Sequence, residues 1–201
     1  MKTKLRITFN APLVLCFALA CAVVTLIRVL GGESVANLLF STYGAPMSDP
    51  LMYLRLFTHV LGHADLGHLV GNMAYILLLG PGLEEKYGPK KLAAVILITA
   101  LITGILHNLF FPGTRLLGAS GVAFAFILLT SFTESRKGEI PLTVILVALI
   151  YLGQQIWEAV AVRDNISNLS HIIGGLVGGG AGYLLNRNNS ASARKYHGYS
   201  A

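Results

Sequence analysis

The sequence predicts an all-α membrane protein, built as one bundle of six transmembrane helices, and two observations carry that prediction. The composition is the first: 54% of the 201 residues are hydrophobic, 12% are charged, and the mean hydropathy is +0.67. A soluble domain carries about 25% charged residues. The second is a set of six apolar runs that are long enough, or nearly so, to cross the roughly 30 Å hydrocarbon core as helices. These runs leave no room for a separate soluble domain.

The six apolar runs follow one another along the chain. They occupy residues 12–30, 67–83, 92–111, 118–132, 140–157 and 168–185. The fourth and fifth runs are short, and short spans often end in a water-filled cavity or a thinned bilayer. The chain therefore divides into three parts: a cytoplasmic N-terminal segment over 1–11, the six-helix membrane domain over 12–185, and a basic tail over 186–201 that we expect to be disordered.

The distribution of basic residues orients this bundle. Eleven of the 15 Lys and Arg residues lie before the first run, between the second and third, between the fourth and fifth, or after the sixth. Cytoplasmic loops are enriched in Lys and Arg, so we expect both termini in the cytoplasm. The net charge of +6 is spread over these segments, which argues against nucleic acid as a partner. The lack of a cytosolic or transit extension favours a prokaryotic plasma membrane.

The first run also has features of a secretory signal or a poor lipobox, because basic residues precede it and residues 18–21 read ALAC. The run continues to Leu30, which favours a retained helix, and cleavage stays an open alternative. Cys16 and Cys21 are the only cysteines in the sequence. We expect both to be packing residues of the first helix, without a disulfide or a metal ion.

Two polar motifs interrupt the apolar runs. Residues 118–121 read GASG and place Ser120 between small residues, and residues 170–174 read SHIIG and place His171 three residues before a glycine. Polar and ionisable groups are costly in a bilayer, so they are functional candidates by default. Glycines at four-residue spacing let membrane helices approach closely, which would bring Ser120 within hydrogen-bond reach of His171. A serine becomes a strong nucleophile when an adjacent base takes its proton, so the pair predicts a hydrolase.

A second polar pair is expected at the same depth. His68 and Asn72 lie near the start of the second run and are spaced i,i+4 on one helical face. The second, fourth and sixth runs cross the membrane in the same direction, so this pair falls beside Ser120 and His171, a few residues below the outer surface. On its own, this pair would be interpreted as a structural hydrogen-bonding pair. Beside Ser120 and His171, its side chains become candidate donors to the oxyanion that forms during acyl transfer. The Ser120 N–H, near a helix N-terminus, is a third candidate donor.

In this order and topology the motifs resemble those of the rhomboid family of intramembrane serine proteases, over about residues 51–185. The family carries G-x-S-G at the start of the fourth helix, and a histidine at the start of the sixth helix with glycines three and seven residues later. It also carries H-x-x-x-H-x-x-x-x-H-x-x-x-N across the second helix, which ends in an acidic-basic stretch. The matching residues are Gly118, Ser120, Gly121, His171, Gly174, Gly178, His59, His63, His68, Asn72 and the stretch 84–88.

The resemblance implies a rhomboid-like six-helix fold whose first loop is partly embedded in the membrane. It implies that Ser120 is the nucleophile and that His171 is the general base of a dyad without an aspartate. His68, Asn72 and the Ser120 amide would form the oxyanion hole. The fifth helix and the loop after it, 157–165, would form a lateral gate for the substrate.

Two positions depart from the family pattern. The family's first loop usually contains a Trp-Arg pair, whereas the matching sequence here, YLRLF, keeps Arg55 and has Leu54 in place of the tryptophan. The tyrosine that often follows the nucleophile by four residues is Phe124, which can still stack on the histidine but lacks a hydroxyl. We expect Arg55, His59 and His63 to be structural residues of the loop.

The expected function is that of an intramembrane serine endopeptidase, which cleaves transmembrane client proteins within or near their membrane segments and needs no cofactor or metal ion. Its partners would be these clients and the lipid bilayer. The alternative is a non-catalytic rhomboid-like protein that binds membrane clients, although such proteins lose the serine or the histidine. A metalloenzyme built on His59 and His63 lacks an H-E-x-x-H motif, and a transporter would carry polar groups across the midplane.

Overall fold

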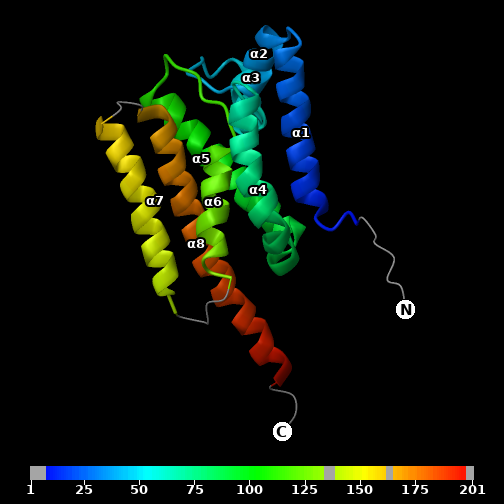
Figure 1. Ribbon diagram of the computed structural model, residues 1–201, viewed down its shortest axis with the longest axis vertical. Helices are drawn as coiled ribbons and strands as arrows, with labels where there is room; N and C mark the ends of the chain where they lie inside the picture. Colours follow the sequence, from blue (N-terminus) through cyan, green and yellow to red (C-terminus); the bar gives the residue numbers. More distant parts are fainter. Residues whose placement is uncertain (1–7, 134–138, 162–164, 198–201) are drawn as a thin grey trace.

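The computed structural model describes residues 8–133, 139–161 and 165–197 (Figure 1). Within these residues the regular elements are helices, and the β contact is one isolated antiparallel bridge between Thr42 and Leu116. The helices are α1 (Pro12–Val29), α2 (Glu33–Phe40), α3 (Pro50–Thr58), the 3₁₀ helix η1 (His59–Leu61), α4 (Leu66–Tyr87), α5 (Pro89–Phe110), α6 (Ser120–Thr130), α7 (Leu142–Ala161) and α8 (Asn165–His197). The long helices pack side by side as a bundle, and α2 and α3 lie together near one end of it (Figure 1).

Each of the six predicted apolar runs overlaps one helix of the bundle. Three described helices, α1, α4 and α5, are long and apolar enough to cross a membrane by length and composition. Helix α6 has only 11 residues, because the chain reaches it through a non-helical connection that ends at Ala119. The apolar part of α7 is Leu142–Tyr151. The structure thus supports three candidate spans, and the six-span count stays a prediction.

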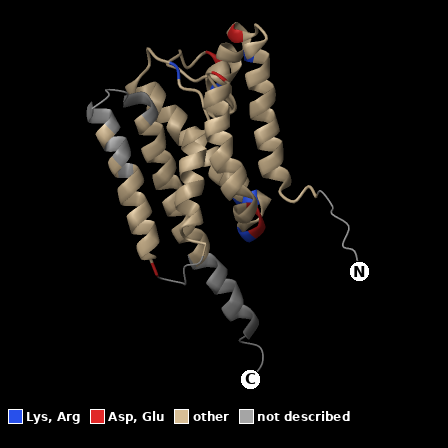
Figure 2. Cartoon of the chain, in the orientation of Figure 1, with Lys and Arg blue, Asp and Glu red and all other residues tan. Residues whose placement is uncertain are grey.

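The charged residues of the described chain lie near the ends of the bundle. Figure 2 shows Lys, Arg, Asp and Glu around α2 and α3 at one end and around the junction of α4 with α5 at the other, with uncharged helix surfaces between. Many apolar side chains on these surfaces are exposed, among them Leu78, Leu109 and Leu149. Exposed leucines between two charged ends are the arrangement that a surrounding bilayer stabilises.

The corner between α4 and α5 is tighter than the sequence predicts. The predicted runs end at 83 and restart at 92, whereas α4 ends at Tyr87 and α5 begins at Pro89. Gly88 alone separates them and has a φ of +82°, which a glycine adopts without the strain of a Cβ atom. Pro89 then opens α5 at a position where no intrahelical N–H is needed.

Helix α8 is longer at both ends than the predicted run 168–185. It begins at Asn165, so His171 lies further inside the helix than its predicted place at the start. It continues to His197, so the tail over 186–201, expected to be disordered, is helical as far as that residue. The tail contains no proline before His197 and only one glycine, Gly198, beyond it, and its alanines and basic residues favour a helix. The boundaries of the three predicted segments themselves stay predictions.

Helix α6 lies at the centre and packs against α4, α5, α7 and α8. Its contact with α8 depends on glycines. A Cβ atom built on Gly174 would lie 2.0 Å from the carbonyl oxygen of Gly121, and one built on Gly178 would lie 2.1 Å from that of Ala125. Because no side chain fits at either position, the glycines set how closely α8 approaches the helix that begins with Ser120.

Helix α1 is fastened to the bundle by a buried carboxylate. The Glu84 side chain, only 5% exposed, accepts the backbone N–H of Leu13 at 3.1 Å and that of Val14 at 3.0 Å. These N–H groups belong to the first turn of α1 and have no intrahelical acceptor. The acidic-basic stretch predicted at the end of the second run therefore contains the residue that caps the first helix.

Candidate active site

The connection before α6 delivers Ser120 to the first position of that helix. Gly118 has a φ of +129° and donates its N–H to the carbonyl of His59 at 3.0 Å. A Cβ atom at Gly118 would lie 2.8 Å from Cε1 and Nε2 of His68 and 3.7 Å from Nδ2 of Asn72. Glycine is therefore required at this position for two reasons: the backbone conformation, and the close approach of two side chains from α4.

A pocket of about 300 Å³ surrounds Ser120. Its lining comes from three helices that are distant in sequence: α4, α6 and α8. The lining residues are His68, Gly71, Asn72, Tyr75, Ser120, Ala123, Phe124 and His171. The structure thus brings together the four residues that sequence reasoning placed at one depth, the predicted dyad and the predicted side-chain donors.

The imidazole of His171 is held against α6 by an aromatic stack. Its ring and that of Phe124 are nearly parallel, at 8°, with centroids 4.3 Å apart. Phe124 also meets Tyr151 of α7 edge-on, with centroids 5.4 Å apart and planes at 88°. The stack expected from the sequence is therefore present without the hydroxyl of a tyrosine.

The Nε2 side of His68 lies next to Gly118. Asp65 caps α4 by accepting the His68 backbone N–H at 2.8 Å, which fixes this residue in the first turn. The ring nitrogen Nδ1 accepts the backbone N–H of Ala64 at 3.4 Å. A neutral ring that accepts at Nδ1 carries its proton on Nε2, the nitrogen next to Gly118. His68 can therefore donate a hydrogen bond from Nε2, and it lines the same pocket as Ser120.

Asn72 supplies a second donor. The residue is 7% exposed, and its Nδ2 atom is buried without a hydrogen-bond partner among the described residues. A buried amide group without a partner is costly, and in native proteins such a group calls for an explanation. An acceptor that enters the pocket would remove this cost.

His63 supports the wall of the pocket from behind. Its Nε2 accepts the Ala119 N–H at 3.4 Å, its Nδ1 faces the Leu61 carbonyl at 3.3 Å, and its ring meets that of His68 edge-on with centroids 5.0 Å apart. Burial, assisted by the neighbouring His68, lowers the pKa of His63 from 6.5 to about 4. The ring is thus neutral at pH 7, as an accepting Nε2 requires.

Two other predicted loop residues lie outside the pocket lining. His59 is buried and bonds the Ala100 carbonyl through Nε2 at 3.0 Å, and burial lowers its pKa to about 4. Arg55, 1% exposed, donates to the Tyr43 hydroxyl at 2.8 Å and to the Leu38 carbonyl at 3.4 Å, and forms an ion pair with Asp49. Its guanidinium also lies over the Tyr43 ring, 4.4 Å from the centroid. The Arg55 contacts join α3 to α2 and to the segment between these two helices, and the His59 contact joins η1 to α5.

The metal-binding alternative rests on His59 and His63. His59 and His63 bond different groups, the Ala100 carbonyl and the Ala119 amide. Among the residues that the structure describes, no group of three or more His, Cys, Asp and Glu side chains could hold a metal ion.

The predicted gate over 157–165 falls partly outside the described chain, which omits residues 162–164. Trp157, on α7, is 71% exposed.

Sequence reasoning missed Ala123 of α6 and two residues of α4 that line the pocket, Gly71 and Tyr75. A Cβ atom at Gly71 would meet nothing within 4 Å, so this glycine leaves space beside Ser120. Both residues continue the helical face of His68 and Asn72 at i+3 and i+7. Extending that spacing by one turn would have found them.

A comparison with known protein families gives a match over most of the chain. Residues 50–188 match the family model of the Rhomboid domain. The matched segment begins at the start of α3 and ends within α8, so it contains every residue that lines the pocket at Ser120.

Proposed function

The chain belongs to the rhomboid family, and we propose that it is an intramembrane serine endopeptidase that cleaves transmembrane client proteins within or near their membrane segments. The observation that carries this proposal is the shared pocket of Ser120 and His171, which also receives His68 and Asn72. A nucleophile, a base and two donors around one small cavity are the parts that acyl transfer requires.

The proposed reaction has two stages. His171 takes the proton of the Ser120 hydroxyl as the oxygen attacks the carbonyl carbon of the scissile peptide bond. The oxyanion that forms accepts hydrogen bonds from Nε2–H of His68, Nδ2–H of Asn72 and the Ser120 amide. His171 then returns the proton to the leaving amine. Water, activated by the same base, releases the acyl group from Ser120.

The proposed membrane arrangement follows from the short helix α6. We place all six helices of the bundle across the bilayer, with both termini in the cytoplasm of a prokaryotic cell. Helix α6, at 11 residues, rises only about 16 Å, roughly half of the hydrocarbon core. Ser120 at its start would then lie below the outer surface, where a water-filled pocket can supply the hydrolytic water. The fifth helix of the bundle, α7, and the loop after it, 157–165, would form the lateral gate through which the client enters.

The second candidate function is client binding without catalysis. It predicts the same fold and the same family, and it differs only in the chemistry of the pocket. Both Ser120 and His171 are present and share that pocket, which favours the protease. The Nδ2 atom of Asn72, which has no hydrogen-bond partner among the described residues, also favours the protease, because an oxyanion could accept a hydrogen bond from it.

The deciding experiment labels the purified, detergent-solubilised protein with a fluorophosphonate serine probe, next to Ser120→Ala and His171→Ala. We expect wild-type labelling that both variants lose, and the same pattern in cleavage of a transmembrane reporter. Labelling that survives in Ser120→Ala would mean that the nucleophile is another residue. If the folded wild-type protein neither reacts with the probe nor cleaves the reporter, the client-binding function is the better assignment.

A further inference from the structure

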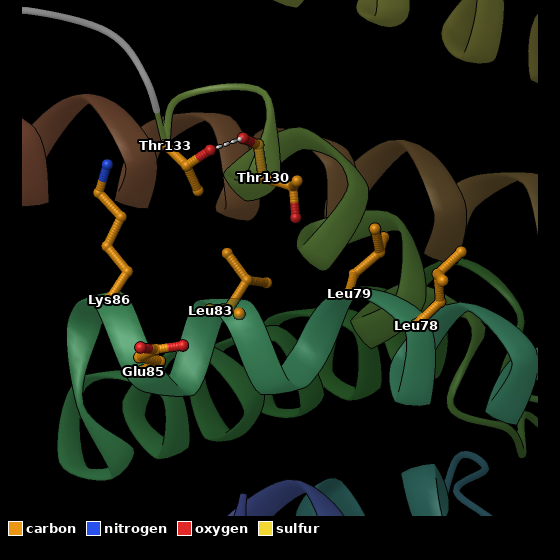
Figure 3. Close-up of a pocket in the computed structure, with 8 residues that line it drawn as sticks. Leu78, Leu79, Leu83, Glu85, Lys86, Thr130 and Thr133 are labelled. Carbon is orange, nitrogen blue, oxygen red and sulfur yellow. Dashed lines mark hydrogen bonds between the residues drawn. The ribbon is translucent and has the colours of Figure 1, made fainter. Parts of the chain in front are cut away.

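A second cavity lies at the far end of α4 (Figure 3). It has a volume of about 480 Å³ and lies between α4, the end of α6 and the turn that follows α6. From His68 to Lys86 the helix rises by about 27 Å, nearly the thickness of the hydrocarbon core. This cavity therefore belongs to the opposite membrane interface from the pocket at Ser120, and the two share no lining residue.

One wall of the cavity is apolar. Leu78, Leu79 and Leu83 of α4 line it (Figure 3). Leu78 is 76% exposed, so this wall continues onto the surface that faces lipid. Gly82 lies among them, and a Cβ atom built on it would meet nothing within 4 Å. The glycine thus keeps the middle of the cavity open.

The rim at the end of α4 is charged. Glu85 and Lys86 are exposed neighbours in the last turn of the helix, and neither has a salt bridge within the described parts of the chain. The Lys86 ammonium lies 5.9 Å from the centroid of the Tyr87 ring, a distance at which the attraction is weak. The rim therefore offers one cation and one anion that nothing in the described protein neutralises.

The facing side, from α6, adds hydroxyl groups. Oγ1 of Thr130 is buried and has no hydrogen-bond partner within residues 8–133 or the rest of the described chain. Thr133 donates its hydroxyl proton to the Thr130 carbonyl at 2.8 Å, which leaves its oxygen free to accept (Figure 3). A buried hydroxyl without a partner, beside an open cavity, indicates a ligand with acceptor atoms.

We propose that this cavity binds a phospholipid whose headgroup carries both a phosphate and a primary ammonium, as phosphatidylethanolamine does. The phosphate oxygens accept hydrogen bonds from Lys86 and from the Thr130 hydroxyl, and the ammonium donates to the Glu85 carboxylate. One acyl chain lies along the leucines and over Gly82. Free phosphate would leave the apolar wall and Glu85 unused, and a lipid with an anionic headgroup would meet the repulsion of Glu85. The inference does not depend on the proposed catalysis.

The test measures retained lipid by native mass spectrometry of the purified full-length protein. It compares phosphatidylethanolamine with phosphatidylglycerol of the same acyl chains, and with inorganic phosphate alone. We expect preferential retention of phosphatidylethanolamine, reduced about two- to fivefold by Lys86→Gln or by Glu85→Gln, the size expected for one exposed ion pair. Glu85→Gln should also narrow the preference over phosphatidylglycerol. Lys90→Gln removes an exposed positive charge outside the cavity and should change nothing.

A second variant blocks the cavity without touching its charges. Gly82→Leu fills the open centre, and we expect it to abolish lipid retention while Ser120 keeps its reactivity with a fluorophosphonate. Ser120→Ala should retain lipid as the wild type does, which separates this proposal from the proposed protease. Equal retention of both lipids by every variant, or an adduct of inorganic phosphate only, would overturn the proposal. If Gly82→Leu does not fold, the Lys86 and Glu85 variants decide the question alone.

Discussion

The imidazole of His171 lies face to face with the ring of Phe124, with centroids 4.3 Å apart and planes at 8°. The two residues come from different helices, and Phe124 is one turn of α6 beyond Ser120. The stack therefore fixes the plane of the proposed base relative to the helix that carries the proposed nucleophile. In the proposed dyad, which has no aspartate, this contact would take over part of the orienting role that a carboxylate has in a triad.

Removing the stack should lower the rate of catalysis more than the binding of substrate. Phe124→Leu keeps an apolar side chain but loses the parallel ring, and we expect kcat to fall about tenfold, since an aromatic pair is worth about 0.5–1.5 kcal/mol. KM should change little. Phe124→Tyr keeps the ring and should remain near the wild-type rate. The measurement is the cleavage rate of a transmembrane reporter; a wild-type kcat for Phe124→Leu would refute the orienting role.

Removing the unpartnered donor should lower activity without lowering stability. Asn72→Ala deletes Nδ2, a buried donor that has no partner among the described residues. Loss of one oxyanion donor costs about 100- to 1,000-fold in kcat, whereas deleting an unsatisfied buried group is close to neutral for folding. Cleavage assays and thermal unfolding of the same samples check both halves. A variant that unfolds early, with activity lost in proportion, would assign Asn72 a structural role instead.

Replacing either of two glycines of α8 by alanine should change the free energy of unfolding in opposite directions. Gly174→Ala places a methyl group 2.0 Å from the Gly121 carbonyl oxygen, so α8 must move away from α6. We expect a loss of about 1–3 kcal/mol in the free energy of unfolding, as when a packed core is overfilled, together with lost activity. Gly180→Ala meets nothing within 4 Å and should be neutral or stabilising by up to about 1 kcal/mol, because alanine is the better helix former.

Unfolding of the two alanine variants in detergent, followed by circular dichroism, distinguishes them. The pair is matched in helix and in substitution, so a difference between them reports the contact with α6 alone. Similar unfolding curves for Gly174→Ala and Gly180→Ala would contradict the close approach of the two backbones.

The sequence was sufficient to predict that four polar residues share a pocket, because polar side chains in apolar runs are few and the predicted alternating direction of the runs gives them a common depth. Ser120, His68 and Asn72 each lie in the first turns of a helix, as predicted. His171 lies further from the start of α8, yet it reaches the same pocket. Depth in a bilayer is a coarse property, and errors of one turn do not disturb it.

Features that depend on tertiary contacts were beyond the sequence. Nothing in the local pattern indicates that Glu84 reaches the first turn of α1, since the N–H groups that donate to it are about 70 residues away in the chain. The shortness of α6 was underestimated, because hydropathy does not distinguish a helical Gly118 from one with a φ of +129°. The extent of α8 was underestimated as well, since a polar composition does not exclude a helix where no Gly or Pro interrupts it.

Two buried histidines should make the protein less stable in mild acid. Burial lowers the pKa of His59 and of His63 from 6.5 to about 4. Between these values the unfolded chain binds more protons than the folded one, so the free energy of unfolding falls as the pH falls from about 6.5 towards 4. Above pH 6.5 it is unaffected by these groups. The slope is at most about 1.4 kcal/mol per pH unit for each histidine.

Chemical unfolding at a series of pH values between 7.5 and 4.5 tests this dependence. His63→Gln replaces the titrating Nε2 acceptor by an amide oxygen that can accept the Ala119 N–H but does not titrate in this range. The variant should therefore show a shallower loss of stability in acid than the wild type. An identical pH dependence in both proteins would show that His63 is not neutral through burial.

Detaching α1 should weaken the bundle without altering the pocket. Glu84→Ala leaves the N–H groups of Leu13 and Val14 without their acceptors, and we expect the free energy of unfolding to fall by about 1–3 kcal/mol. Glu85→Ala removes an exposed carboxylate one residue away and should stay within about 0.5 kcal/mol of the wild type in detergent. Thermal unfolding compares the two variants.

The reactivity of Ser120 separates this effect from a catalytic one. Glu84 lies at the opposite end of α4 from His68 and lines no part of the pocket at Ser120. Below its unfolding transition, Glu84→Ala should therefore react with a fluorophosphonate at the wild-type rate. A folded Glu84→Ala that labels slowly would mean that the first turn of α1 and the pocket are coupled through α4. In that case the capping carboxylate would act on the orientation of His68 and Asn72 as well as on the attachment of α1.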